Sequence, residues 1–286
     1  MADLGETLIL ILGLVFVVGS MLAMGFSLTF GMIVKPLKNW KFDAIVLIVN
    51  FVIVPVVIIG LATIFSLPED IKIGMIIMAF AAGAPFTPKL VHFAKGDIAL
   101  SVGIMTLLML IAAIVLPIML PLVLPGVEVN AWEIAKPLIF LMLLPLGIGL
   151  LVKSRYEQFA EHAAKLLISV TTLSVIILLF LFFAIYWNDI VSTFGTGAIG
   201  FSVFFVLFAL VAGYFAGGRE KSSRRVLGIS TAQRNIGAGL LIADINFADR
   251  PMVGITILIL TLASLVVLMV VSGEWGRKKK SEVKAE

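Results

Sequence analysis

The chain has 286 residues, of which 61% are hydrophobic and only 13% are charged, and its mean hydropathy is +1.18. A soluble domain of this length cannot cover so much apolar surface, so the composition predicts a membrane protein that crosses the bilayer several times. The net charge of +4 does not indicate a nucleic-acid partner, because the basic residues fall in short loops and the tail, and the absence of cysteine excludes disulfides and thiol chemistry.

Apolar stretches long enough to span a bilayer recur nine times along the chain. They cover approximately residues 6–33, 43–66, 71–94, 97–123, 133–153, 162–187, 194–217, 224–246 and 251–272. Turn or charge signals separate them, including Lys35-Pro36, Leu124-Pro125-Gly126 and Trp187-Asn188-Asp189. The sequence therefore predicts an all-α polytopic membrane protein with nine transmembrane helices.

The distribution of basic residues predicts the orientation. Of the 21 lysines and arginines, 16 lie in one set of loops and the C-terminal tail, three lie in the opposite loops, and two lie within spans. Positive charge marks the cytoplasmic side, so we expect a multi-pass protein of the cell (inner) membrane with a cytoplasmic C-terminus and, from nine spans, an external N-terminus. The residues before the first span lack the basic region of a cleavable signal peptide, so we expect that span to be retained.

Two spans contain sequences that break a helix. Residues 71–94 contain Pro85 and Pro88, each of which removes a backbone donor and disfavours helix in the residue before it. Residues 224–246 contain a polar run from Ser230 to Asn235. Each interrupted span is the third of four consecutive spans, and the two sets of four enter the membrane from opposite sides. This arrangement predicts an inverted repeat, with interrupted helices at the binding site.

The repeat sets the expected division of the chain. Residues 1–124 form the first repeat, residues 125–272 form the second repeat with one more helix, and residues 273–286 form a basic cytoplasmic tail. Within the second interrupted span, we expect Gly237 and Gly239 to allow another backbone to approach closely.

Lys89 and Arg234 lie in the interrupted spans, and a charge at this depth costs several kcal/mol unless it faces a cavity, a partner or a substrate. If the two interrupted helices cross, the ends of their half-helices and both cations would form an electropositive region that suits an anion, with hydrogen bonds from Thr87, Gln233 and Asn235. Alternatively, each cation pairs with a buried carboxylate and only stabilises packing, or Lys89 extends to the cytoplasmic face.

Other polar residues in the spans are further candidates for a role in binding, proton transfer or packing. Asn50 is a lone amide that contacts either substrate or a neighbouring helix. Asp244, which alone among the carboxylates lies clearly within a span, and His92 are candidate proton carriers. Ser101 and Thr106 are expected to bond to the backbone of their own helix. Two histidines without an acidic cluster give no reason to expect a metal site or a cofactor.

Several motifs in order along the chain resemble those of a known family. They are Met24 to Leu28 with Lys35-Pro36, Asn50 to Pro55, Phe93 to Val102, and Gln233 to Gly237. Together they make the chain similar to the bile acid:sodium symporter superfamily over nearly its whole length. The resemblance implies a panel domain and a core domain in which two broken helices cross. This chain resembles a nine-span form that lacks the first of ten spans.

The chain departs from this family at the residues that would hold sodium. Matching without gaps places the family's sodium-binding carboxylate on Ser230, the amide that follows it on Arg234, and a Ser-Asn pair on Thr87 and Pro88. A one-residue shift would instead align Gln233 with that amide.

Two further sodium ligands of the family also have counterparts in this sequence. One hydroxyl position falls on Met105, although a second one matches Ser101, and an amide from an earlier span falls on Asn50. Sodium prefers several oxygen ligands and net negative charge, so this substituted site would repel it.

The sequence and the resemblance together favour a secondary transporter of a small organic anion, expected to be a carboxylate. We expect it to be sodium-independent, with Lys89 and Arg234 replacing the sodium ions, and to work by alternating access in the lipid bilayer as a monomer or homodimer. One alternative is a sodium-coupled symporter with one site retained around Asn50 and Gln233. Another is an anion-selective channel. No pair of nucleophile and base indicates an enzyme.

Overall fold

The computed structural model describes residues 2–29, 31–32, 39–124 and 131–285, and the side chains of these residues except 2–6, 179, 182 and 278–285. The described residues form helices and connecting turns, without strands. The predicted joints at Lys35-Pro36 and Pro125-Gly126 lie outside the described residues, as do the side chains of the lysines that follow Arg277.

Seven continuous helical segments of the described chain are long and apolar enough to cross a membrane. Two are made of three consecutive pieces: α3 (Trp40–Ile48), η2 (Val49–Ile53) and α4 (Val54–Ile64), and α8 (Ala131–Pro137), η3 (Leu138–Leu143) and α9 (Leu144–Arg155). The others are α1 (Ala2–Ser27), α7 (Ile98–Val123), α10 (Glu157–Ile185), α12 (Ala198–Ala216) and α15 (Pro251–Ala285). These seven segments coincide with seven of the nine predicted spans.

The two spans predicted to be broken are interrupted in the structure. The first consists of α5 (Glu69–Phe80) and α6 (Thr87–Phe93), and the second of α13 (Lys221–Ala232) and α14 (Ile236–Asn246). The prediction of two interrupted helices is therefore confirmed, whereas the inverted repeat and the membrane crossing of these pairs stay predictions.

Three boundaries differ from the prediction. Helix α1 ends at Ser27 rather than near residue 33, and beyond it the N–H of Met32 donates to both the carbonyl and the hydroxyl of Thr29. The expected turn at Trp187 is instead the short helix α11 (Trp187–Ser192). The residues expected to form a separate tail instead continue helix α15 as far as Ala285. In this part of α15, Arg277 pairs with Glu274 one turn earlier.

The π-helical pieces η2 and η3 each end two residues before a proline, Pro55 and Pro145. Proline has no N–H and clashes with the carbonyl four residues earlier. Widening the preceding turn to a π-bulge removes the clash and keeps the helix continuous. The prolines therefore deform these two spans without breaking them.

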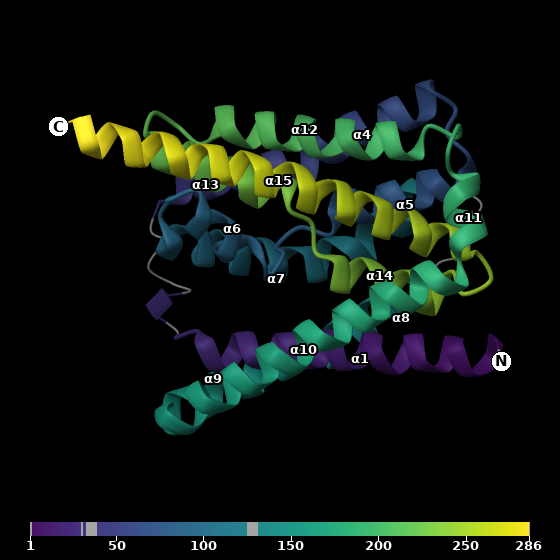
Figure 1. The fold of residues 1–286 in the computed structure, drawn as a ribbon, viewed down its shortest axis with the longest axis horizontal. Helices are drawn as coiled ribbons and strands as arrows, with labels where there is room; N and C mark the ends of the chain where they lie inside the picture. Colours follow the sequence, from purple (N-terminus) through teal and green to yellow (C-terminus); the bar gives the residue numbers. More distant parts are fainter. Residues whose placement is uncertain (1, 30, 33–38, 125–130, 286) are drawn as a thin grey trace.

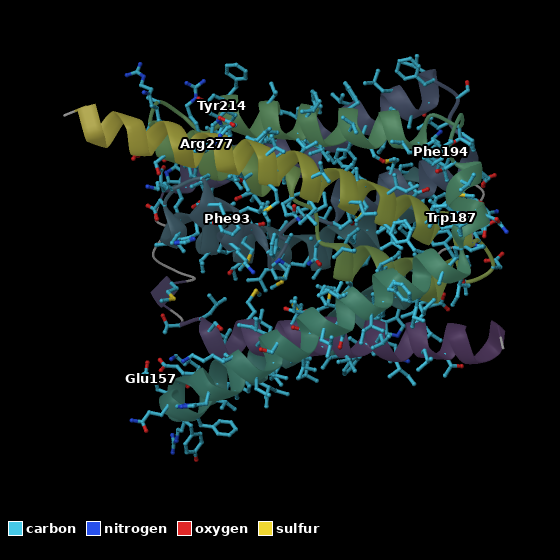
Figure 2. The ribbon with its side chains drawn as sticks, viewed as in Figure 1. Phe93, Glu157, Trp187, Phe194, Tyr214 and Arg277 are labelled. Atoms are coloured by element: carbon cyan, nitrogen blue, oxygen red, sulfur yellow. The ribbon has the colours of Figure 1, made fainter. Side chains whose placement is uncertain are left out.

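The helices form two layers (Figure 1). The α1 layer consists of α1, α8–α9 and α10. The α15 layer consists of α3–α7 and α12–α15, with α5 almost completely buried in it. The layers meet mainly where α14 and α7 contact α1, α8 and η3. Figure 2 shows Trp187 and Phe194 at one end of the long axis and Glu157, Tyr214 and Arg277 at the other.

Glycines join α1 to α9 inside the α1 layer. A Cβ on Gly25 would lie 2.4 Å from the carbonyl oxygen of Leu146, and one on Gly149 would lie 2.8 Å from the Cα of Gly25. The two helices therefore meet backbone to backbone, as small residues permit in membrane proteins.

An arginine fixes one joint of the α15 layer. Arg250, between α14 and α15, donates to Glu69 at 2.9 Å and lies 3.4 Å from Asp70, at the start of α5. The hydrogen bond to Glu69 is the main cause that raises the pKa of Arg250 above its ordinary value. This pair is exposed, so its contribution to stability is small.

Candidate functional site

The first interruption is a backbone structure. Residues 81–86 join α5 to α6, and Gly83 adopts a left-handed conformation with φ of +84°. A Cβ at this position would lie 2.3 Å from the backbone nitrogen of Met109 in α7. Pro85 lies within the interruption and Pro88 in the first turn of α6, where a missing N–H costs no helical hydrogen bond. The residues before these prolines therefore offer carbonyls that no helix uses.

The second interruption is made of polar side chains. Gln233, Arg234 and Asn235 separate α13 from α14, and all three are buried. The Oδ1 atom of Asn235 accepts from the N–H of Ala238 at 3.2 Å, so asparagine caps the start of α14. Because Asn235 caps α14, the helix can begin again after the interruption without leaving the N–H of Ala238 unpaired.

The two interruptions meet through hydrogen bonds that all run in one direction. The backbone N–H of Asn235 donates to Ala81 O at 2.8 Å, and its Nδ2 donates to Gly83 O at 3.3 Å. The Nη1 atom of Arg234 donates to Ala79 O at 3.1 Å. The end of α5 and the first interruption thus supply the acceptors and the second interruption supplies the donors. The two broken helices therefore meet, whereas their crossing stays a prediction.

Arg234 is a buried guanidinium with unused donors. Its exposed fraction is 2%, and its Cζ lies 5.6 Å from the centroid of the Phe205 ring. Its Nε and Nη2 atoms are buried and have no hydrogen-bond partner. None of the ion pairs among the described side chains includes Arg234. Arg234 therefore does not pair with a buried carboxylate among the described side chains.

Gln233 faces a different helix from Arg234. Its Oε1 accepts from the hydroxyl of Ser264 in α15 at 2.9 Å. Sequence reasoning did not identify Ser264, although a serine in the middle of an apolar span was a usable signal. It also did not identify Phe205 as the ring beside Arg234, because α12 contains several phenylalanines and the sequence does not distinguish this one.

Three buried oxygen atoms near this region lack partners. Asn50 uses its Nδ2 to reach Val46 O at 3.0 Å and the Thr231 hydroxyl at 3.2 Å, but its Oδ1 is unpaired. The hydroxyls of Ser101 and Ser230 are also buried without a partner. Within the described side chains, the unpaired buried polar atoms therefore lie on predicted site residues, with one further hydroxyl on Ser272.

The prediction that Ser101 bonds to its own helix is wrong, since its hydroxyl has no partner. The same prediction for Thr106 is confirmed, because its hydroxyl donates to Val102 O at 2.8 Å. Both residues lie in α7, which packs against α13. The free hydroxyl of Ser101 keeps it among the candidates for ligand contact.

Lys89 does not join the buried group. Its side chain is exposed, with Nζ 5.4 Å from the centroid of the Phe86 ring, while Thr87 in the same helix is buried. Helix α6 has only seven residues, so two turns of helix present some residues to the interior and others to the surface. The two predicted cations therefore differ in environment, and Arg234 alone is buried at the interruptions.

The prediction that Gly237 and Gly239 allow another backbone to approach closely is wrong. A Cβ on Gly239 would meet the sulfur of Met78 at 2.7 Å, and one on Gly237 would lie 3.4 Å from Cγ2 of Val17. These are side-chain contacts, whereas the close backbone approach occurs at Gly83.

The two candidate proton carriers lie in separate cavities. Asp244 is an exposed residue and lines a cavity of about 280 Å³ between α14 on one side and α1, η3 and α10 on the other. His92 lines a cavity of about 530 Å³ near the start of the C-terminal tail, together with Lys95 and Arg277. No residue of the interruptions lines either cavity.

A family model for the sodium bile acid symporter family matches residues 11–193, which include the first interruption but not the second. The chain is 25% identical over 219 residues to "Uncharacterized sodium-dependent transporter YocS" of Bacillus subtilis (strain 168), across 74% of this chain and 66% of that protein. It is 27% identical over 170 residues to "Probable sodium/metabolite cotransporter BASS2, chloroplastic" of Oryza sativa subsp. japonica, across 59% of this chain and 39% of that protein.

The aligned segments span less than two thirds of either relative. Members of the matched family and both relatives are transporters rather than enzymes, which agrees with the expectation from the sequence. The apolar helices and the matched family make this a multi-pass membrane protein. The chain belongs to the sodium bile acid symporter family.

Proposed function

We propose that this chain is a secondary transporter for a small organic anion, and that the guanidinium of Arg234 takes the place of the sodium ions that other members of the family bind. The observation that carries this proposal is the environment of Arg234, which is buried at the second interruption, has two unpaired nitrogens and makes no ion pair with any described side chain. A buried charge that no opposite charge neutralises is a candidate functional group in a membrane protein.

An anion suits this site for two reasons. The unpaired Nε and Nη2 of Arg234 offer hydrogen bonds and charge to a carboxylate. Helix α14 begins beside Arg234, and the N-terminus of a helix carries partial positive charge. A carboxylate near the second interruption would therefore gain both attraction and hydrogen bonds.

Independence from sodium follows from the same charge. Two unit charges 4 Å apart repel by about 4 kcal/mol at an effective dielectric constant of 20. A sodium ion near the guanidinium would bear a penalty of this order. The hydrogen bond from Arg234 to Ala79 O meanwhile ties the second interruption to the first, as a shared ion would do.

In this proposal the two layers move relative to each other during transport. The α15 layer, which holds both interruptions, corresponds to the expected core domain, and the α1 layer to the expected panel domain. Substrate would bind between them beside the start of α14. The contacts of α14 and α7 with α1, α8 and η3 would open and close around it.

A sodium-coupled symporter is the second candidate, and a specific observation favours it. Asn50 Oδ1 and the hydroxyls of Ser101 and Ser230 are buried oxygens without partners. Oxygen atoms of this kind are sodium ligands, and the relatives are named as sodium-dependent. In this alternative, one sodium site would remain beside Arg234.

Thermal unfolding of the purified protein separates the two candidates. The wild type is measured with acetate, pyruvate, benzoate and taurocholate, in buffers with either sodium or choline as the cation. Arg234→Met removes the guanidinium and preserves much of the side-chain volume, while Arg250→Met, the control, removes a half-buried arginine that lies outside both interruptions. A ligand at a hundred times its Kd stabilises a protein by about 2.7 kcal/mol.

The proposal expects at least one anion to stabilise the wild type equally in sodium and in choline. Arg234→Met should lose this stabilisation and Arg250→Met should keep it. Stabilisation of the wild type by sodium itself would contradict sodium independence and support the second candidate.

A further inference from the structure

The cavity between the two layers is apolar apart from one residue. Its volume is about 280 Å³, and its walls come from α1, η3 and α10 on one side and α14 on the other. Among the described residues that line it, Asp244 alone has a polar side chain. A carboxylate in such a place is costly unless it is neutralised, so its presence points to a function.

The cavity extends along α14 toward the second interruption. Phe16 and Val17 line it, and the same two residues face Gly237 in the first turn of α14. Asp244 follows the capping Asn235 by nine residues, roughly 14 Å along the helix. An organic anion with its charge at the start of α14 and its apolar part in the cavity would therefore extend toward Asp244.

No cation shares the cavity with Asp244 among the described side chains. The helices packed against α14 are α1, α5, α8, η3 and α15. Helix α10 adds Leu178 to the cavity wall. The described charged and titratable side chains of these helices, of α10 and of the joint after α14 are all absent from the cavity lining: Glu69, Asp70, Lys72, Glu133, Lys136, Glu157, Glu161, His162, Lys165, Asp249, Arg250, Glu274 and Arg277. The side chains of Asp3 and Glu6 in α1 lie outside the described ones.

We propose that Asp244 binds a proton together with the substrate anion, so that one proton accompanies each anion across the membrane. This inference rests on the proposed function. When the apolar part of the substrate fills the cavity, an ionised Asp244 would lose contact with water and would face the substrate's negative charge roughly 14 Å away along α14, whereas the protonated form would bear neither cost. Proton binding and anion binding therefore favour each other.

In this proposal the proton on Asp244 is the coupling ion, a role that the guanidinium of Arg234 cannot have. The guanidinium is covalently fixed, so it cannot be taken up on one side and released on the other. The proton on Asp244 enters from the solution that the cavity faces and leaves after the anion has gone. A monoanion and one proton move together without net charge, and the empty carrier returns with Asp244 ionised or exchanges one anion for another.

The first test is the pH dependence of anion binding. Taurocholate and 1-naphthalenesulfonate are suitable probes, because sulfonates stay ionised between pH 5 and 8 and pH then acts on the protein alone. Wild-type binding should tighten as pH falls, by at most about tenfold per pH unit for one linked proton. Asp244→Asn should bind with the same affinity throughout this range. Asp249→Asn, just beyond α14, should follow the wild type.

The second test is transport into liposomes with equal sodium on both sides. An acidic outer solution should make wild-type liposomes accumulate the bound sulfonate above its external concentration. Those with Asp244→Asn should only equilibrate it, while exchange of labelled for unlabelled sulfonate continues.

The outcomes separate this inference from the proposed function. If binding depends on Arg234 but Asp244→Asn keeps the pH slope, the proton site is wrong and the anion site stands. If only a carboxylate of the thermal-unfolding panel binds, the same pH series is measured with that carboxylate between pH 6 and 8, where it stays ionised. If the wild type binds neither the sulfonates nor any anion of that panel, or if binding survives in Arg234→Met, the proposed function fails and this inference fails with it.

Discussion

The two interruptions differ in the hydrogen-bonding groups that they contribute to each other. At the first, the end of α5, the prolines and Gly83 leave backbone carbonyls free, and those of Ala79 in α5 and of Ala81 and Gly83 act as acceptors. At the second, Arg234 and Asn235 supply the donors. A broken helix inside a membrane must satisfy its backbone from within the protein, and here each interruption satisfies the other.

This difference shows where selectivity can reside. The first interruption depends on backbone geometry, so its side chains can vary while its conformation cannot. The second depends on side-chain chemistry, and the unused nitrogens of Arg234 are what remains after its structural hydrogen bond is made. The following predictions test this asymmetry in order of their expected effect on stability.

The largest effect is expected for Gly83→Ala. Its left-handed φ alone costs about 1–3 kcal/mol for a residue with a Cβ, and the added methyl would also collide with the Met109 backbone in α7. We expect most of this variant to unfold or fail to accumulate. Gly60→Ala in α4, where a Cβ would meet nothing within 4 Å, is the control and should unfold at the wild-type temperature or slightly above it.

Asn235→Ala should cost about 1–2 kcal/mol, because α14 loses its cap and Gly83 O loses a donor. Asn235→Ser separates the two contributions, since serine can cap the helix but is too short to reach Gly83. Unfolding in detergent should rank the wild type above Asn235→Ser and that variant above Asn235→Ala. Equal stability of the two variants would mean that the bond to Gly83 contributes nothing.

The hydrogen bond between Asn50 and Thr231 should contribute about 0.6 kcal/mol, as interhelical bonds do on average in membrane proteins. A double-mutant cycle with Asn50→Leu and Thr231→Val measures this coupling. A coupling energy above about 2 kcal/mol would show that Asn50 is a structural residue rather than a ligand-binding candidate.

Arg234→Met should change the stability of the unliganded protein least, although it should abolish anion binding. Replacing a buried charge by an apolar side chain of similar size is often neutral or stabilising, and it removes two unpaired donors at the same time. Thermal unfolding without added anions checks this. A fall of several kcal/mol would show that Arg234 serves mainly to hold the interruptions together.

Much of this architecture could be predicted from the sequence because its signals are local. Apolar length locates the helices, and the residues around Pro85 and from Gln233 to Asn235 cannot continue a helix without losing donors or burying polar atoms. The polar run also identifies Arg234 as the cation that needs an explanation.

The remaining features depend on packing, which the sequence does not display. Whether Lys89 faces the interior depends on the rotation of a two-turn helix, and the structure turns it to the surface. Whether Ser101 bonds to its own helix depends on which rotamer its neighbours permit. The widened turns before Pro55 and Pro145 did have a signal, because a proline can deform a helix as well as end it.

The contact between Gly25 and Gly149 has a consequence for motion. Helices that touch through their backbones cannot slide past each other without separating, so α1 and α9 should travel as one rigid body through the proposed cycle. Spin labels placed on these two helices should keep a single distance under all conditions. Labels on α1 and α14, which face each other through side chains around the cavity, should report two distances whose proportions shift when substrate is added.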